Sequence, residues 1–268
     1  MNKAIEEVPF EPVKITGDTP TMRLFSLLEQ IVSQERQFSL QDLVDSTDLP
    51  KPTLHRMLQQ LEQARMLVRD ADGRHYCIGE RLRRFAENLL LNDTKHGARH
   101  AVLKALVDEL GESCNLTALS GSEVLYLDRV ETEAPLRFYL RPGSRVPVHC
   151  SASGKVLLAQ MPPAQRRRLL AHAPMEQFTP NTIQSLEELE QDCERVREQG
   201  YAFDNEEFLP GLFCVAVLVP RKEGGRSNLA IATQAPIMRM TPDKALQALP
   251  ALRRAASALM EIEAQYEK

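Results

Sequence analysis

The sequence predicts an α+β fold in two domains, and three observations support this. At 268 residues, the chain is long enough for about two domains. Its first part shows the periodicity of short amphipathic helices, whereas residues 113–235 contain several short apolar runs separated by turn signals, as antiparallel strands do. Hydrophobic residues make up 43% of the chain, so that both domains can bury a core.

The composition argues against several classes of protein. A net charge of −4 argues against a chain that coats nucleic acid through overall basicity. Five scattered cysteines without a C-x-x-C pair fit a reducing compartment. The N-terminus has acids and prolines where a signal peptide needs an apolar core, and the longest apolar run, 212–219, is too short for a membrane helix. We therefore expect a flexible arm over residues 1–18 and a cytoplasmic protein without a membrane partner.

After the arm, the chain predicts three helices followed by a hairpin. The first helix, from Thr21, places Phe25 on its apolar face. Ser39 stands three residues before Asp42, which is an N-cap signature for a second, short helix. A third helix begins at Pro52, a residue suited to the first helical position, and has apolar residues at i, i+3, i+4 and i+7. The segment "MLVRDADGRHYCI" then predicts two strands around an Asp-Gly turn.

This order of elements is that of a winged helix-turn-helix, which we assign to residues 19–78. Opposite its apolar stripe, the third helix carries Arg and Gln side chains, which can bond to guanine and adenine. Residues 51–84 hold eight cations against four acids, a local charge of +4 that suits phosphate contact. The predicted DNA-binding residues are Ser39, Lys51, Pro52, Thr53, His55, Arg56, Gln59, Gln60 and Arg74.

Two other interpretations of this helix face stay open. A polar face can simply be solvated, and a helix-turn-helix can dock onto another protein without touching DNA. Binding to DNA weakens with salt by a slope of about −0.9 per neutralised phosphate, so that salt dependence separates these alternatives. We favour a sequence-specific complex with a double-stranded, pseudo-palindromic operator.

A linker helix is predicted over residues 79–94. In "GERLRRFAENLLL", the apolar residues recur at helical spacing and the arginines lie off that stripe. We expect this helix to pack against its counterpart in a homodimer, and two such dimers can join into a tetramer. Packing onto its own domain is the alternative.

Residues 95–268 predict a second α+β domain. "SCNLTALS" and "EVLYLDRV" are strands joined by a Gly-Ser turn, and "LRFYL", residues 136–140, is expected to be a further strand. The run Arg166–Arg168 is expected on the solvated face of a short helix. A long C-terminal helix follows Pro242, with a kink or break expected at Pro250.

The segment "VHCSASGKVLLA" predicts a helix start that can bind an anion. A loop of small residues enters a helix, so that the amides near Ala152 and Ser153 point outward at the positive end of the helix dipole. An ordinary capped helix start is the alternative. His149, Cys150 and Asp204 are candidates for an enzyme with Cys–His chemistry. Adjacent strand residues point to opposite faces, however, and no P-loop or dinucleotide motif is present. We therefore expect no catalytic residues, cofactor or metal site.

Several ordered segments resemble the IclR family of bacterial transcription regulators. In the first domain these are "DLPKPTLHRMLQQLE" and "VRDADGRHYCIGERL"; in the second they are "NLTALSGSEVLYLDRVE", "GSRVPVHCSASGKVLLA" and "GYAFDNEEFLPGLFCVAVLV". The resemblance covers about residues 20–260. It implies a GAF/PAS-like sensor domain over residues 95–268 and a regulator whose binding to its operator responds to a small organic acid.

The resemblance also implies where that acid binds. The implied effector-binding residues are Phe138, Val146, Ala152, Ser153, Asp204, Leu212, Cys214, Ala232 and Gln234. The amides of Ala152 and Ser153 would take the carboxylate, and Asp204 and Gln234 would read hydroxyl or carbonyl groups. Phe138 suggests an aromatic acid. The polar "TQAP" departs from the small serines that many family members carry at this point.

Overall fold

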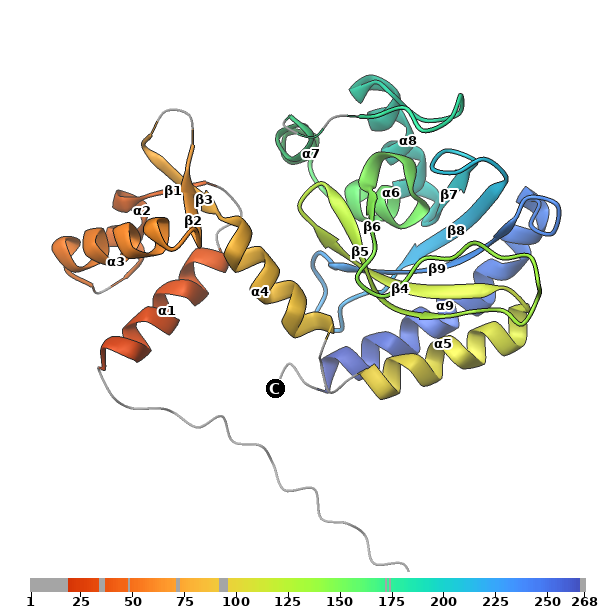
Figure 1. The fold of residues 1–268 in the computed structure, drawn as a ribbon, viewed down its shortest axis with the longest axis horizontal. Helices are drawn as coiled ribbons and strands as arrows, with labels where there is room; N and C mark the ends of the chain where they lie inside the picture. The colour runs from red at the N-terminus through yellow and green to blue at the C-terminus, as the bar shows by residue number, and fades with distance from the viewer. Residues whose placement is uncertain are drawn as a thin grey trace, which may run out of the picture. The chain divides into compact units, whose positions relative to one another are not determined.

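The computed structural model describes residues 19–33, 37–47, 49–70, 73–91, 96–171, 173 and 175–265. They form two compact units, one that ends at Leu89 and one that begins at Leu90 (Figure 1). The predicted arm over residues 1–18 lies outside the described residues. Within the described part of the chain, no helix is long and apolar enough to cross a bilayer.

The smaller unit is a winged helix-turn-helix followed by a further helix, as the sequence predicts. Its elements are α1 (Pro20–Ser33), β1 (Phe38–Ser39), α2 (Leu40–Ser46), α3 (Lys51–Gln63), β2 (Leu67–Arg69), β3 (His75–Ile78) and α4 (Glu80–Leu91). The central strand, β3, pairs antiparallel with both β1 and β2. Of the predicted Asp-Gly turn, Asp72 lies outside the described residues, and Gly73 has a φ of +70°, which glycine adopts readily.

The core of the smaller unit joins all three helices of the motif. Leucines on one face of α3 pack with Leu27 and Ile31 of α1 and with Leu43 of α2. The predicted N-cap is confirmed: Ser39 and Asp42 form a reciprocal capping box at the start of α2. The predicted burial of Phe25 is wrong, because this side chain is 55% exposed and α1 turns Leu27 into the core instead.

The larger unit is built on one six-stranded antiparallel sheet with helices on both faces. Its strands are β4 (Ser113–Ser120), β5 (Glu123–Val130), β6 (Arg145–Pro147), β7 (Ala202–Asn205), β8 (Leu212–Leu218) and β9 (Leu229–Pro236), in the order β6-β5-β4-β9-β8-β7. On one face pack α5 (His96–Leu110) and α9 (Pro242–Ala264), and on the other pack α6 (Ala152–Ala159), α7 (Pro163–Leu170) and α8 (Leu186–Gln199) (Figure 1).

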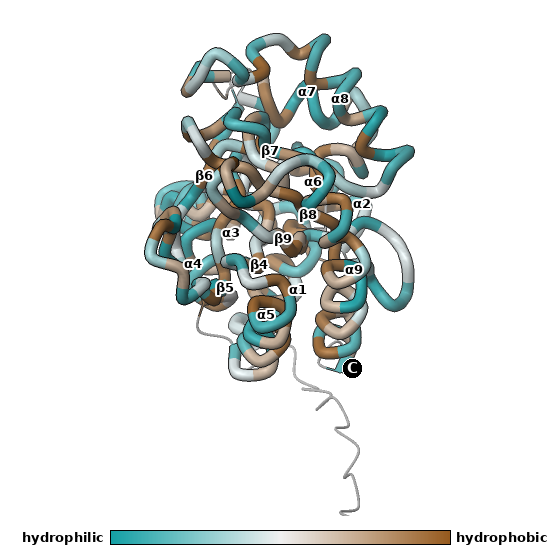
Figure 2. The backbone as a smooth tube through the Cα atoms, turned by 90° about the vertical axis from the view of Figure 1, so that its right-hand side faces the viewer, coloured by the Kyte–Doolittle hydropathy of each residue, from teal (hydrophilic) through white to brown (hydrophobic). Residues whose placement is uncertain are grey.

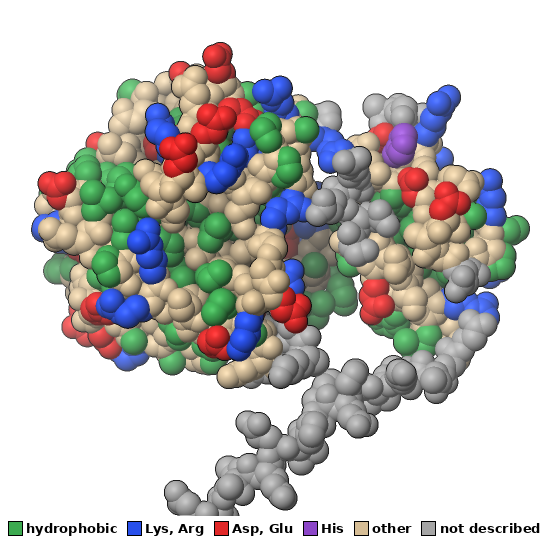
Figure 3. All heavy atoms as spheres, turned by 180° about the vertical axis from the view of Figure 1, so that it is seen from behind, with side chains coloured by type: hydrophobic (Ala, Val, Ile, Leu, Met, Phe, Trp, Pro, Cys, Tyr) green, Lys and Arg blue, Asp and Glu red, His purple; other side chains and the backbone are tan. Residues whose placement is uncertain are grey.

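Burial on both faces explains why the central strands are almost continuously apolar. Alternate residues of each strand enter two cores, so that Phe213 and Val215 of β8 pack toward α9, whereas Cys214 and Ala216 pack toward α6. The helices are amphipathic instead: α8 is largely hydrophilic with separate hydrophobic positions (Figure 2). Figure 3 shows acidic and basic side chains interspersed over one face of this unit.

Three sequence expectations for the larger unit are wrong in whole or in part. Residues 136–140 form no strand, because β6 pairs with β5 at this edge of the sheet. The guanidinium of Arg129 donates a hydrogen bond to the carbonyl of Phe138. Arg166 is not solvated: it is 1% exposed and forms an ion pair with Glu190 of α8, whereas Arg167 and Arg168 are exposed as predicted. α9 is not broken at Pro250, since the helix continues to Ala264 with its apolar residues packed on the sheet; the alternative of a kink stays a prediction.

Candidate functional site

One helix face of the smaller unit carries most of the predicted DNA-binding residues. On α3, Leu54, Leu58 and Leu61 are buried, because they share one side of the helix. The exposed residues of the predicted set are Lys51, Pro52, His55, Arg56, Gln59 and Gln60, and Thr53 is half-buried. Arg and Gln side chains presented from one helix face can bond to the edges of guanine and adenine in the major groove.

The wing is held against α3 by one arginine. Arg69 of β2 pairs with Glu62 of α3, with 3.0 Å between Nε and Oε1, and its guanidinium lies over the ring of Tyr76. The exposed Arg74 stands just before β3, at the turn end of the hairpin. The wing, which Arg69 fixes to α3, therefore presents a further basic residue, Arg74.

Ser39 differs from the rest of the predicted set. Its hydroxyl accepts a hydrogen bond from the amide of Asp42 and donates one to the carboxylate of the same residue, at 2.9 Å. A phosphate contact through this hydroxyl would compete with the cap, and loss of such a cap costs about 0.5–2 kcal/mol. In the structure, the hydroxyl of Ser39 therefore caps α2.

In the larger unit, a cavity of about 20 Å³ lies beside the start of α6. It is lined by residues from α6 and from all six strands. Seven of the nine implied effector-binding residues line it: Val146, Ala152, Ser153, Asp204, Leu212, Cys214 and Ala232. The other lining residues are Asn115, Val124, Tyr126, Ser151 and Phe208. A cavity of this size holds about one water molecule.

The start of α6 brings two backbone amides to this cavity. Ser151 caps the helix, and its hydroxyl accepts the amide of Gly154 at 3.2 Å. The amides of Ala152 and Ser153 have no acceptor within the described part of the chain. Gly154 is required here, because a Cβ atom would collide with the backbone of Val148. Two free amides and the positive end of the helix dipole together favour an anion.

Asp204 is the acidic residue of the cavity lining. It is 2% exposed. Burial, with the nearby charge of Glu207, raises the pKa of Asp204 to about 7, although the amides of Glu207 and Phe208 donate to its Oδ1 at 2.8 and 3.3 Å. Near neutral pH this carboxyl is therefore protonated in a large share of the molecules, and it can then donate a hydrogen bond to a ligand oxygen.

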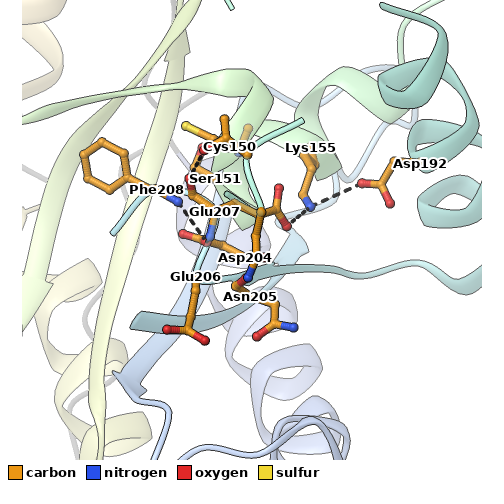
Figure 4. A network of polar contacts seen from close by, with 12 residues as sticks. Cys150, Ser151, Lys155, Asp192, Asp204, Asn205, Glu206, Glu207 and Phe208 are labelled. Atoms are coloured by element: carbon orange, nitrogen blue, oxygen red, sulfur yellow. Dashed lines mark hydrogen bonds and ion pairs between the residues drawn. The ribbon is translucent and has the colours of Figure 1, made fainter. Parts of the chain in front are cut away.

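A buried ion cluster anchors the wall that holds Asp204. The Nζ of Lys155 in α6 lies 2.6 Å from Glu207 and 3.3 Å from Asp192 of α8. Figure 4 shows both contacts as dashed lines. Despite the opposing effect of burial, these carboxylates raise the pKa of Lys155. The cluster ties α6, α8 and the connection after β7 to one another, so that these elements shift together.

Arg129 of β5 adds a buried cation to the same face of the sheet. It pairs across the strands with Asn115, a residue of the cavity lining. Burial lowers the pKa of Arg129. Its Nη2 donates to the carbonyl of Phe138 at 2.5 Å, and its Nε lies 3.7 Å from Glu131. Its Nε and Nη1 have no hydrogen-bond acceptor among the described residues. This charge favours an anion on this side of the sheet.

Two implied effector residues, Phe138 and Gln234, lie outside the cavity lining. Phe138 lines a separate surface pocket of about 190 Å³ together with Ile237 and Met238. Gln234 is buried, and its Oε1 accepts from Asn115 at 3.3 Å. Sequence reasoning had missed Asn115 and Tyr126 of the lining, although polar atoms on an otherwise apolar strand are a signal that could have found them.

The candidate Cys–His pair occupies a turn that opposes such chemistry. His149 and Cys150 lie in a 3-10 turn, Val148–Cys150, and not on a strand as the sequence suggested. Burial lowers the pKa of His149 and raises the pKa of Cys150. A nucleophilic thiolate beside an imidazolium requires both shifts in the opposite direction.

On α4, the apolar residues that we expect to face a second copy of the chain are largely exposed. Leu82 is buried, but Phe85 and Leu89, one helical turn apart, are 56% and 59% exposed. Phe85 also lines an open groove of about 920 Å³ formed by α4 and the segment that follows α3. Exposed aromatic and aliphatic side chains in one stripe are typical of an interaction surface.

Comparisons with known proteins agree with this geometry. Residues 20–71 match the IclR helix-turn-helix domain, and residues 95–261 match the C-terminal domain of the bacterial transcriptional regulator IclR. The chain is 45% identical over 245 residues to the probable transcriptional regulator SauR of Cupriavidus necator, a match that covers 91% of this chain and 97% of that protein. It is 30% identical over 232 residues to the transcriptional repressor IclR of Escherichia coli, with 85% and 84% covered.

The crystal structure of the Thermotoga maritima IclR has the same fold. It matches with a TM-score of 0.60 and 25% identity, over 90% of this chain and 97% of that one. The two matched domains correspond to the two units described above. The chain therefore belongs to the IclR family of bacterial transcriptional regulators, with a helix-turn-helix DNA-binding domain and a C-terminal ligand-binding domain.

Proposed function

We propose that this regulator reads an operator through α3 and changes its affinity for DNA when a small organic acid enters the cavity beside α6. The observation that carries the proposal is the division of α3 into a buried leucine face and an exposed face with Arg56, Gln59 and Gln60. A helix that presents Arg and Gln side chains can bond to the edges of guanine and adenine in the major groove. The local surplus of basic residues around α3 supports contact with phosphates.

The DNA-binding proposal is tested by Arg56→Ala. Operators are first selected from genomic fragments, and affinity is then measured by fluorescence anisotropy at several salt concentrations. If Arg56 contacts a base, its loss costs about 1–3 kcal/mol and relaxes sequence preference. Arg254→Ala, which removes an exposed arginine from α9, is the matched control. Equal affinities of the two variants would remove Arg56 from the contact set, and the absence of a salt-sensitive complex with any DNA fragment would favour a protein-docking role.

For the effector, we propose a small aliphatic acid with a further polar group. The amides at the start of α6 and the charge of Arg129 favour a carboxylate, and Asp204 can pair with a hydroxyl or carbonyl oxygen. Phe138 lines another pocket, which removes the support for an aromatic acid. Because the cavity has about 20 Å³, the lining must widen to admit several heavy atoms.

A thermal-shift screen against small carboxylic acids tests this site. An acid at 100 times its dissociation constant stabilises the folded state by about 2.7 kcal/mol. Ser153→Leu would place a bulky side chain at the start of α6 and abolish the shift. Ser257→Leu on the exposed side of α9 is the control, and circular dichroism checks that both variants fold. A shift that persists in Ser153→Leu would locate the acid elsewhere.

We further propose that the regulator acts as a homodimer and without catalysis of its own. The uncovered Phe85 and Leu89 support packing of α4 against a second copy. The lowered pKa of His149 and the raised pKa of Cys150 argue against a nucleophilic thiolate. The acid can change DNA binding by no more than its difference in affinity for two arrangements of the dimer.

A further inference from the structure

We propose that His96, His100 and Asp128 form a binding site for a divalent transition metal ion, with Zn²⁺ as the preferred occupant. The site is separate from the cavity beside α6. Both histidines belong to α5, which packs on the opposite face of the sheet. Asp128 lies on β5 and turns toward α5, whereas its neighbour Arg129 pairs with Asn115 on the cavity face.

The distances between the donor atoms suit a metal ion. Residues at i and i+4 of a helix share one face, so that His96 and His100 point the same way. The Nδ1 of His100 lies 3.1 and 3.2 Å from the two carboxylate oxygens of Asp128, and the Nδ1 of His96 lies 3.8 Å from Oδ2. One atom from each residue lies within 4.8 Å of the others. A tetrahedral Zn²⁺ with bonds of about 2.0–2.1 Å holds its ligand atoms about 3.3 Å apart.

The charge of Asp128 also calls for a cation. Its side chain is 3% exposed, and a buried carboxylate needs charge compensation and hydrogen bonds. The amide of Arg129 donates to Oδ1 at 2.7 Å and orients the carboxylate. Among the described residues, the basic side chains within 4 Å of its carboxylate oxygens are His96 and His100. A metal ion held by the two neutral imidazoles would supply the compensating charge.

The arrangement leaves room for exchange with solvent. The side chains of His96 and His100 are 54% and 46% exposed, so that an ion can enter without rearrangement of the core. Two imidazoles and one carboxylate leave a fourth position for water. Imidazole nitrogen suits Zn²⁺ better than Mg²⁺ or Ca²⁺, which prefer oxygen ligands. Sequence reasoning missed the group because Asp128 follows His100 by 28 residues.

The test uses the full chain without a polyhistidine tag, after treatment with a chelator. We expect one equivalent of Co²⁺ to give the visible absorption of a nitrogen- and oxygen-ligated site, without a thiolate-to-metal band, and Zn²⁺ to displace it. Isothermal titration then measures the affinity for Zn²⁺. His100→Ala should weaken binding at least about 10-fold, because loss of a residue that only orients a metal ligand already costs about 10- to 100-fold.

Two further variants make the test decisive. Asp128→Asn should weaken binding in the same way, and His100→Ala keeps the test valid if loss of the buried carboxylate prevents folding. His75→Ala is the control, because it removes a histidine that pairs with Asp70 in the other unit. Equal Zn²⁺ affinities of the native chain and His100→Ala would overturn the proposal. So would the absence of stoichiometric binding, which would reduce the cluster to hydrogen bonds between histidine and aspartate.

Discussion

Asp204 leads to a specific prediction about stability and pH. Burial raises the pKa of its carboxyl from 3.8 to about 7 in the folded chain, whereas in the unfolded chain it titrates near its ordinary value. A raised pKa means that the folded state binds the proton more tightly. The resulting stabilisation is complete below about pH 4 and is lost as the pH rises through about 7.

The expected size of this effect follows from the shift. A difference of about three pKa units corresponds to about 4 kcal/mol, at about 1.36 kcal/mol per unit. The side chain is only 2% exposed, so that solvent screens the effect little. Burial also raises the pKa of Glu207, which adds a contribution of the same sign. The larger unit should therefore lose several kcal/mol of unfolding free energy between pH 4 and pH 8.

Urea unfolding followed by circular dichroism measures this loss in the native chain and in Asp204→Asn. Asparagine keeps an oxygen that accepts the amides of Glu207 and Phe208, so that the local turn is preserved. The variant should lose most of the pH dependence over this range. Asp108→Asn, at a carboxylate that is 65% exposed, should behave like the native chain. If Asp204→Asn kept the native pH dependence, the buried carboxyl would not be the group that binds the proton.

Three further predictions concern the ion cluster around Lys155, the exposed apolar residues of α4 and the start of α6. Lys155→Met should cost about 3–5 kcal/mol in urea unfolding, because it removes the cation paired with the buried carboxylate of Glu207, and the exposed Lys104→Met should cost little; equal costs would contradict the role of the cluster. The double change Phe85→Asp and Leu89→Asp should yield monomers in analytical ultracentrifugation, and a dimer that survives it would show that α4 is not the interface. Gly154→Ala should abolish the thermal shift by the acid, because its Cβ would push α6 away from Val148. Gly97→Ala, where a Cβ meets open space, is its control, and an unchanged shift in Gly154→Ala would mean that this close approach is not needed.

Local signals predicted most elements of the fold. The capping box at Ser39, the leucine stripe of α3 and the turn between β4 and β5 depend on residues close in sequence, and the structure confirms them. The failures involve partners far along the chain. Arg166 looked solvated because its partner, Glu190, comes 24 residues later. Residues 136–140 have the composition of a strand, but another segment occupies the edge of β5.

The same distinction applies to the cavity. Residues on the cavity side of α6 and β8 were identified because the motif segments that contain them resemble those of a known family. Asn115 and Tyr126 lie in another such segment, but they enter the lining only through the order of the strands, which places β4 between β5 and β9. No local pattern shows that order. The two Arg129 nitrogens that find no hydrogen-bond acceptor among the described residues are likewise visible only once the surrounding side chains are placed.

The small volume beside α6 has a consequence for the speed of the response. A chamber with room for about one water molecule cannot admit an acid at every encounter. If the acid binds there as proposed, its entry must wait for a transient expansion of the walls, which the ion pairs around Lys155 oppose. The observed rate of complex formation should then level off at high metabolite concentration, at the frequency with which the chamber opens. Such a sensor would filter out brief fluctuations in its metabolite and respond to a sustained rise.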